Sequence, residues 1–432
     1  MYSSNELGKT VKIHLSALLI FVSYSLTLNA QPNWTFEQVL KLTVEKNPLA
    51  ESKRSDRAGA RSTKSSAIWQ HFPSPTVEAF REDGVAKTSG LARLDLPIFS
   101  GGQTVAGVKF ADQQYRAADS AVSAAELNLA LSVIETYADA LRQQAKRQFA
   151  REGHDKHTFL LESMKRRVTQ EVSSLADQHL AEIRTNQAAY DLSLINQQFA
   201  SVLAQLVQLS GVPESDALLR PTLDERPVGE ISDSWTTTGG NFSDLNRVIA
   251  RAIDYSPELK RLSYEEQAAD ANIAAKRSVY YPSLLARFEK DFGLSDDERG
   301  LLVLSIQPGA GLSSLTEVDA AKARKLSLSQ NRDAALRAIR QQVTEDWHGL
   351  QGAKMRLEGS ANANNLSDAV YQSYKRQYEI GRKSWVEVLN ALRELTQSQN
   401  SYEDARAQVL VSTLRLKALT GSLMPSSTEL KK

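Results

Sequence analysis

Two histidines come nearest to a chemical site by residue type and spacing. His154 and His157 lie three positions apart, so on a helix they would share one face and could both ligate a metal ion. The sequence offers no cysteine and no evident third ligand near them. We therefore predict no metal site and no cofactor.

The chain carries none of the common motifs of catalysis or nucleotide binding. Gly-x-Ser-x-Gly, His-Glu-x-x-His and the nucleotide fingerprints do not occur, and without Cys there is no thiol nucleophile. No Lys-Ser/Thr of a phosphate loop follows the glycines Gly101, Gly102, Gly309 and Gly311. We expect these glycines to be strand-to-helix hinges, where the backbone turns without a side-chain clash. The chain is not predicted to be an enzyme.

The best-placed carboxylates belong to two helix starts. Ser384 precedes Glu387 by three residues, and Ser174 precedes Asp177 by the same distance, which is the capping-box pattern. Gly381 suits the end of the helix before the second pair. The sequence therefore predicts sharp helix-to-helix turns near 169–174 and 379–384.

Composition indicates a folded, exported chain. Its 432 residues are 41% hydrophobic and 24% charged with a net charge of +1, and no long Lys/Arg block offers a surface for nucleic acid. Residues 1–30 combine Lys9 and Lys12 with an apolar run, as in a signal peptide. Beyond them we expect no stretch of about 20 apolar residues that could cross a membrane as a helix. Any membrane-spanning part would then consist of strands.

The mature chain contains one unit twice. His71–Ser74 (HFPS) recurs as Tyr280–Ser283 (YYPS), and Leu209–Gly211 (LSG) recurs as Leu419–Gly421 (LTG), each 209 or 210 residues later. We place repeat 1 at 34–214 and repeat 2 at 242–424. A linker rich in Pro and Gly occupies 215–241, and a short tail occupies 425–432.

Each unit is predicted to contain a broken helix, a β-hairpin and two long antiparallel helices. Alternating apolar and polar residues mark the strands, at about 75–99 and about 282–306. Heptad spacing, as at Leu127, Ile134 and Leu141, marks helices that pair as coiled coils. The long helices are expected at about 103–168, 174–210, 313–378 and 384–420. The first would be a rod roughly 90 Å long, too long for the interior of a compact globule.

Four strands with open edges cannot lie in lipid, because each unpaired backbone group in hydrocarbon costs several kcal/mol. Closing the sheet removes the edges, but four strands are too few for a transmembrane barrel. Three copies would supply 12 strands, with the helices forming a tube beneath them. The predicted fold class is thus mostly α with a small β part, in a trimer that combines a 12-stranded β-barrel with an α-helical barrel.

Several short runs resemble the TolC family of outer-membrane efflux proteins. They are Leu96–Gly102 (LPIFSGG) before a long helix, the proline after the opening helix of each repeat, and Tyr378–Arg382 (YEIGR) before a Val- and Leu-rich helix. The resemblance covers 34–424. It implies a passive homotrimeric duct in outer-membrane lipid with its helical barrel in the periplasm. It also implies an adaptor (membrane fusion protein) and an inner-membrane ABC transporter or proton-driven pump as partners.

Two longer runs, Leu304–Leu312 and Gly381–Asn390, look like the branch that serves type I secretion of large adhesins and agglutinins. That likeness implies protein cargo, and a multidrug or small-molecule efflux channel is the alternative. A periplasmic coiled-coil adaptor or scaffold is the alternative from another class. Such adaptors carry one helical hairpin and a lipoyl-like β domain, whereas this chain has the hairpin twice.

The resemblance also suggests where the duct closes. Inward residues on the helix after the glycine turn line the periplasmic aperture in the family, and the matching positions are Glu387 and Asn390. Three copies of Glu387 would form one carboxylate ring, which favours cations, although a helix-capping role is an equal alternative. Lys383 matches a residue that ties the closed tip in the family, and Tyr378 and Arg382 are its neighbours. A solvated charged turn would contain the same three residues.

The hairpin tips are the expected adaptor contacts, because a helix-hairpin end presents a small surface to a partner. Repeat 1 has Glu171 and Val172 where the family has a glycine-containing turn, which leaves the geometry of that tip open. The residues expected to contact the adaptor are Val168, Glu171, Ser174, Asp177, Gly381, Ser384 and Trp385.

Overall fold

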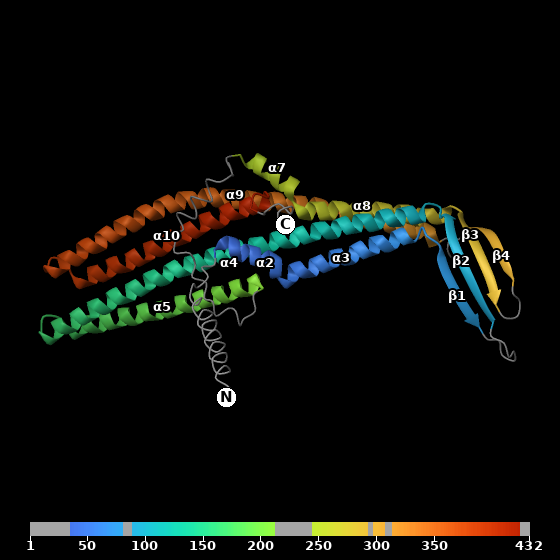
Figure 1. Cartoon of the computed structure of the whole chain (residues 1–432). Helices are drawn as coiled ribbons and strands as arrows, with labels where there is room; N and C mark the ends of the chain where they lie inside the picture. The colour runs from blue at the N-terminus through green and yellow to red at the C-terminus, as the bar shows by residue number, and fades with distance from the viewer. Residues whose placement is uncertain (1–34, 81–88, 212–243, 293–296, 307–312, 424–432) are drawn as a thin grey trace, which may run out of the picture.

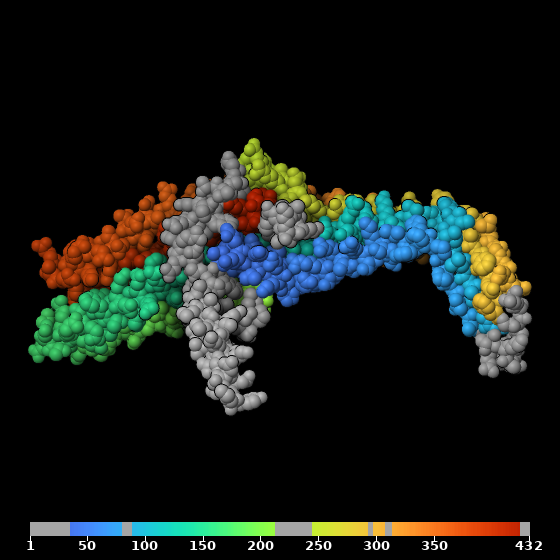
Figure 2. Space-filling model, in the orientation of Figure 1, coloured from blue at the N-terminus to red at the C-terminus, as the bar shows by residue number. Residues whose placement is uncertain are grey.

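The computed structural model describes residues 35–80, 89–211, 244–292, 297–306 and 313–423. The expected signal peptide, linker and C-terminal tail lie outside these residues, as do the expected hinges Gly309 and Gly311. The described chain is a long rod of helices with four strands at one end and two helix turns at the other (Figure 1). The strands form a narrow lobe that bends away from the rod (Figure 2).

The described chain passes twice through the same order of elements. Repeat 1 contains α2 (Phe36–Lys46), α3 (Pro48–Trp69), β1 (Ser74–Phe80), β2 (Ser89–Phe99), α4 (Gln103–Thr169) and α5 (Leu175–Ser210). Repeat 2 contains α7 (Leu245–Tyr255), α8 (Pro257–Arg277), the 3-10 turn Ser278–Tyr280, β3 (Ser283–Phe292), β4 (Glu298–Ser305), α9 (Ser313–Glu379) and α10 (Trp385–Leu419). The predicted class, mostly helical with two tandem repeats, is confirmed.

Each repeat opens with a helix that breaks at a proline. Asn47 ends α2 and caps α3, its side-chain Oδ1 accepting the Leu49 N–H at 2.9 Å. In repeat 2 the Ser256 hydroxyl accepts the Leu259 N–H at 3.2 Å. Proline fits the first position of the second helix because its missing N–H would have no helical partner there.

The long helices pair lengthwise, α4 with α5 and α9 with α10 (Figure 1). Both α4 and α9 have 67 residues and are therefore about 100 Å long. The heptad residues Leu127, Ile134 and Leu141 are buried, where they pack against α2, α5 and α10. Burial of this stripe stabilises the pair, because an apolar side chain removed from water contributes roughly 1.5–3 kcal/mol.

One window of α4 is more apolar than the sequence analysis expected. Eighteen consecutive residues of this helix reach a mean hydropathy of 1.2, enough by length and composition to cross a membrane. Half of the window is buried within the molecule. Because α4 packs on α3, α5, α8 and α10, we interpret the window as the core-facing part of a central helix.

The strands form one antiparallel sheet in the order β1-β2-β3-β4. The β1-β2 and β3-β4 hairpins are joined by pairing between β2 and β3, in which Arg93 lies opposite Glu289 and Leu94 opposite Phe288. Within the described residues β1 and β4 each pair on one side only. Both outer edges therefore keep backbone groups that another chain could pair.

Candidate functional site

The two helix turns at the far end of the rod close with the same backbone geometry. After α4 the N–H of Glu171 donates to the Val168 carbonyl, and the N–H of Val172 to the Arg167 carbonyl, both at 2.9 Å. After α9 the N–H of Gly381 donates to Tyr378 (3.0 Å) and that of Arg382 to Gln377 (2.8 Å). Glu171 has φ +58° and Gly381 φ +74°. The sequence left the geometry of the first tip open, and the structure gives it the same turn as the second.

Each turn is followed by a capping box. Asp177 N–H donates to the Ser174 hydroxyl at 3.2 Å, and Ser174 N–H donates back to the Asp177 carboxylate at 3.3 Å. Ser384 and Glu387 repeat these bonds at 3.4 and 2.9 Å. The helix-capping alternative for Glu387 is therefore present in the structure.

Two polar contacts join the first tip to the second. The indole Nε1 of Trp385 donates to the Asp177 carboxylate at 3.1 Å. The guanidinium of Arg167 lies over the ring of Tyr378, 5.3 Å from its centre, in cation–π contact. The bonds from Ser174 and Trp385 lower the pKa of Asp177. The carboxylate that starts α5 therefore also holds the start of α10.

Beneath these contacts the tips share one apolar core. Trp385, expected at a partner-facing surface, is only 8% exposed and packs inside this core. Val168, expected there too, is half-buried against the same residues. The buried members are Leu160, Leu161, Met164, Ala181, Tyr371, Trp385, Val388, Leu389, Ala391, Leu392 and Leu395. The two hairpins are thus joined at their ends by packing as well as by polar contacts.

Glu387 is paired within its own helix start. Lys383 Nζ donates to its carboxylate at 2.6 Å, and the Lys383 ammonium also lies 4.4 Å from the centre of the Tyr374 ring. The bond from Lys383, together with the bonds from Ser384, lowers the pKa of Glu387 to about 2. Glu387 is therefore ionised at neutral pH, and its charge is largely balanced by Lys383.

The other expected aperture and tip residues are spread over the same end of the molecule. Asn390 is exposed one turn beyond Glu387, and Arg382 is exposed in the turn itself. Glu171, Ser174, Gly381 and Ser384 are exposed as well, and Asp177 is half-buried.

Four apolar side chains lie within the tip segments 168–175 and 378–386 expected to meet the adaptor, but were not named individually as contacts. Val172 and Leu175 on the first tip and Ile380 and Val386 on the second are exposed by 38–66%. The signal that could have revealed them is the presence of large apolar residues directly beside turn and capping residues.

At the opposite end, Gly101 and Gly102 connect β2 to α4 with φ of +62° and +91°. A Cβ on Gly101 would come within 2.7 Å of the Ser278 carbonyl oxygen, so the close approach of the two repeats needs glycine there. This geometry is what a strand-to-helix hinge requires.

The sheet has one apolar and one charged face. Val77, Leu94, Leu96, Phe288, Leu302 and Leu304 lie on one face of the sheet and are exposed. On the opposite face Glu289 accepts from Arg93 at 3.0 Å and from Arg299 at 2.8 Å, while Arg287 donates to Asp95 at 2.7 Å. The sequence predicted the alternation, but not that these charges from both repeats form one paired row.

An exposed apolar face backed by a row of paired charges suits a sheet that meets lipid on one side and water on the other. Joined to a helical rod about 100 Å long, it defines the class of protein as the subunit of a membrane duct.

Comparisons with known proteins agree with this class. The family model described as "Outer membrane efflux protein" matches residues 54–212. Outer membrane protein TolC of Vibrio cholerae is 22% identical over 328 residues, 72% of each chain. The chain is thus similar to outer membrane efflux proteins over most of its first repeat, and to TolC over most of its length. Both the family and the relative are named as outer-membrane proteins, and the family as efflux proteins.

Solved structures show the same fold. The Campylobacter jejuni CmeC outer membrane channel matches with a TM-score of 0.77 at 12% identity, covering 92% of this chain and 88% of that one. The Vibrio cholerae outer membrane protein VceC matches with a TM-score of 0.75 at 14% identity, covering 90% and 97%.

Proposed function

We propose that three copies of this chain form a 12-stranded barrel in the outer membrane, continued by a helical barrel in the periplasm. The observation that carries this proposal is the sheet, whose apolar face is exposed and whose edge strands β1 and β4 each lack a second partner within the described residues. Pairing β4 of one protomer with β1 of the next would satisfy both edges without any new element.

The mass of the detergent-extracted protein tests this assembly. Size exclusion with light scattering, corrected for bound detergent, should give three mature chains, and the complex should fall apart on heating. A proline at Val77, in the middle of β1, should lower the trimer fraction because proline cannot donate in a sheet. The matched control is a proline in the exposed tip turn at Gln170, which should leave the trimer intact. A monomer that stays in solution without detergent would favour the periplasmic scaffold instead.

In this assembly the hairpin tips receive the periplasmic adaptor, and an inner-membrane ABC transporter or proton-driven pump supplies the energy. The exposed apolar residues Val172, Leu175, Ile380 and Val386 support a contact surface at both tips. Site-specific photo-crosslinkers at Val172 and Ile380 should capture the adaptor in cells, whereas one at Tyr190, exposed on α5 away from the tip, should not.

Glu387 is the proposed charge of the periplasmic aperture, and Lys383 is the residue that balances it. In planar bilayers Lys383→Ala should raise cation selectivity, because it frees three carboxylates. Glu387→Ala should lower this selectivity. The double variant should raise conductance, because it clears both side chains from the constriction, and should be less cation-selective than the wild type. Unchanged conductance and selectivity in all three variants would show that Glu387 does not line the aperture.

The cargo we propose is a large protein of the adhesin type, exported by type I secretion. The resemblance at Leu304–Leu312 and Gly381–Asn390 supports this choice over small-molecule efflux. Deleting the gene for this chain should leave the adhesin inside the cell and should not change drug susceptibility. The opposite pattern would assign the duct to small-molecule efflux.

A further inference from the structure

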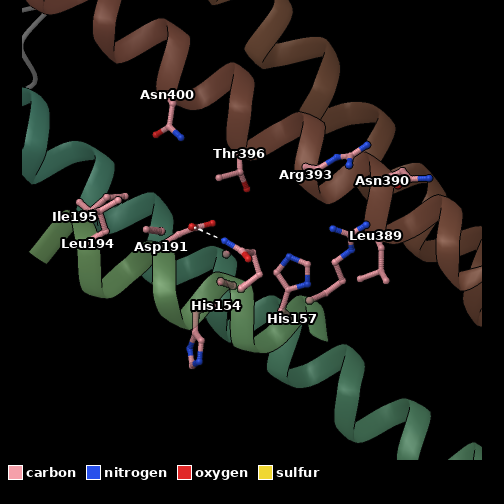
Figure 3. A pocket seen from close by; sticks show the side chains of 15 residues that line it. His154, His157, Asp191, Leu194, Ile195, Leu389, Asn390, Arg393, Thr396 and Asn400 are labelled. Carbon is pink, nitrogen blue, oxygen red and sulfur yellow. Dashed lines mark hydrogen bonds between the residues drawn. The ribbon is translucent and has the colours of Figure 1, made fainter. Parts of the chain in front are cut away.

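A cavity of about 320 Å³ lies between the two helical hairpins, above the shared tip core. Its walls come from α4 and α5 on one side and from α10 on the other (Figure 3). The volume is in the lower range of small-molecule sites. The cavity borders the tip core at Leu389 and the expected aperture at Asn390, but the polar contacts described above do not involve it.

Two arginines lining the cavity have no partner among the described residues. Arg184 comes from α5 and Arg393 from α10, and neither forms a hydrogen bond or an ion pair there. Asp191 is the one carboxylate in the lining, and it already accepts from Gln187 Nε2 at 2.9 Å (Figure 3). Two guanidinium groups against one carboxylate leave the lining with a net positive charge, drawn from both hairpins.

His157 adds a polar group that lacks a partner. In Figure 3 its ring extends toward α10, whereas the ring of His154 points away. The Nδ1 atom of His157 is buried with no hydrogen-bond partner in the described chain, and so is Oδ1 of Asn400. Burial, and then the nearby charges of Arg184 and His154, lower the pKa of His157. An anion between the two arginines and His157 would supply the acceptor that these donors lack, whereas the amide oxygen of Asn400 needs a donor instead.

The rest of the lining indicates the shape of that anion. Leu194, Ile195 and Leu389 form an apolar wall beside the arginines. Guanidinium groups bind carboxylates through paired, charge-assisted hydrogen bonds. We propose that this cavity is a binding site for a carboxylate on a short aliphatic stem, held by Arg184 and Arg393 and contacted by His157. A small free dicarboxylate presents this group, and so does a glutamate side chain on a docking helix.

Calorimetry on the detergent-extracted protein tests the site with two probes, glutarate and a helical peptide that carries a single glutamate. A second peptide with glutamine in its place shows whether the carboxylate is needed. Arg184→Gln and Arg393→Gln should each weaken binding at least tenfold. Arg340→Gln, an exposed arginine on α9 outside the cavity, should bind as the wild type does. Circular dichroism of each variant verifies that the helices are intact.

Two results would support the proposal and identify the source of the group. Glutarate binding that both cavity variants lose would indicate a free small carboxylate. Binding of the glutamate peptide alone, lost in the same variants, would indicate a partner's side chain. The proposal is overturned if neither probe binds, or if the cavity variants bind as tightly as the wild type. Neither result depends on the oligomeric state, so the trimer proposal stands or falls separately.

Discussion

The first and second hairpin tips differ in sequence at the residue that needs the most unusual backbone. Glu171 and Gly381 occupy equivalent positions, both with positive φ, and the same pair of backbone hydrogen bonds closes each turn. A side chain in this left-handed region costs roughly 1–2 kcal/mol, which glycine avoids. The helices and the capping boxes on either side therefore fix the turn, and glycine only makes it easier to form.

The tips also use their capping carboxylates differently. Asp177 of the first tip accepts the indole N–H of Trp385 on the second, whereas Glu387 of the second tip pairs with Lys383 in its own turn. Leu175, the counterpart of Trp385, is 64% exposed. The second tip thus inserts its first helical residue into the shared core, and the first tip leaves the equivalent residue at the surface.

The largest expected effect comes from removing that inserted residue. Trp385→Ala should destabilise the tips by about 3–5 kcal/mol, because it leaves a cavity in the shared core and frees Asp177. Leu175→Ala is the matched control and should cost less than about 0.5 kcal/mol. Hydrogen–deuterium exchange of the whole protein would show faster exchange at the starts of α5 and α10 in the first variant alone. Equal exchange in both variants would mean that the tips are not coupled through Trp385.

A smaller effect should follow from exchanging the turn residues. Glu171→Gly should stabilise the first turn by about 0.5–1 kcal/mol, because relief of the left-handed strain exceeds the added entropy of the unfolded chain. Gly381→Ala should destabilise the second turn by about 1 kcal/mol, and the reason is backbone strain, since a Cβ there would meet no neighbouring atom. Exchange rates at residues 168–173 and 378–383 measure both changes. If Glu171→Gly gives no stabilisation, or Gly381→Ala no destabilisation, the two turns are not equivalent.

The sequence predicted the elements of this molecule better than their contacts. Heptad spacing predicted a helix over 103–168, and the structure has one from Gln103 to Thr169, because a long apolar stripe indicates helix wherever it packs. Alternation of apolar and polar residues predicted the two faces of the sheet, because successive residues of a strand point to opposite faces. The bonds from Trp385 to Asp177 and from Arg167 to Tyr378 were not predicted, because periodicity assigns a residue to a face without naming the partner on another helix.

The smallest expected effect distinguishes the two capping carboxylates by pH. Folding holds the pKa of Glu387 at about 2, below its ordinary value of 4.5, so its contribution to stability is complete above pH 4.5 and is lost as the pH falls toward 2. Glu387→Gln keeps a residue that can cap the helix but cannot pair with Lys383. The difference in thermal midpoint between wild type and this variant should therefore shrink as the pH falls from 5.5 to 2.5.

Asp177→Asn supplies the comparison, since the pKa of Asp177 is also lowered, in this case from 3.8. Its difference from wild type should begin to shrink at a lower pH than that of Glu387→Gln, because the unfolded carboxyl takes up its proton later. This variant should also release the start of α10, because the carboxylate that accepts the Trp385 N–H is lost. If Glu387→Gln releases the start of α10 just as much, the two capping carboxylates have the same role. The inferred difference between the tips is then contradicted.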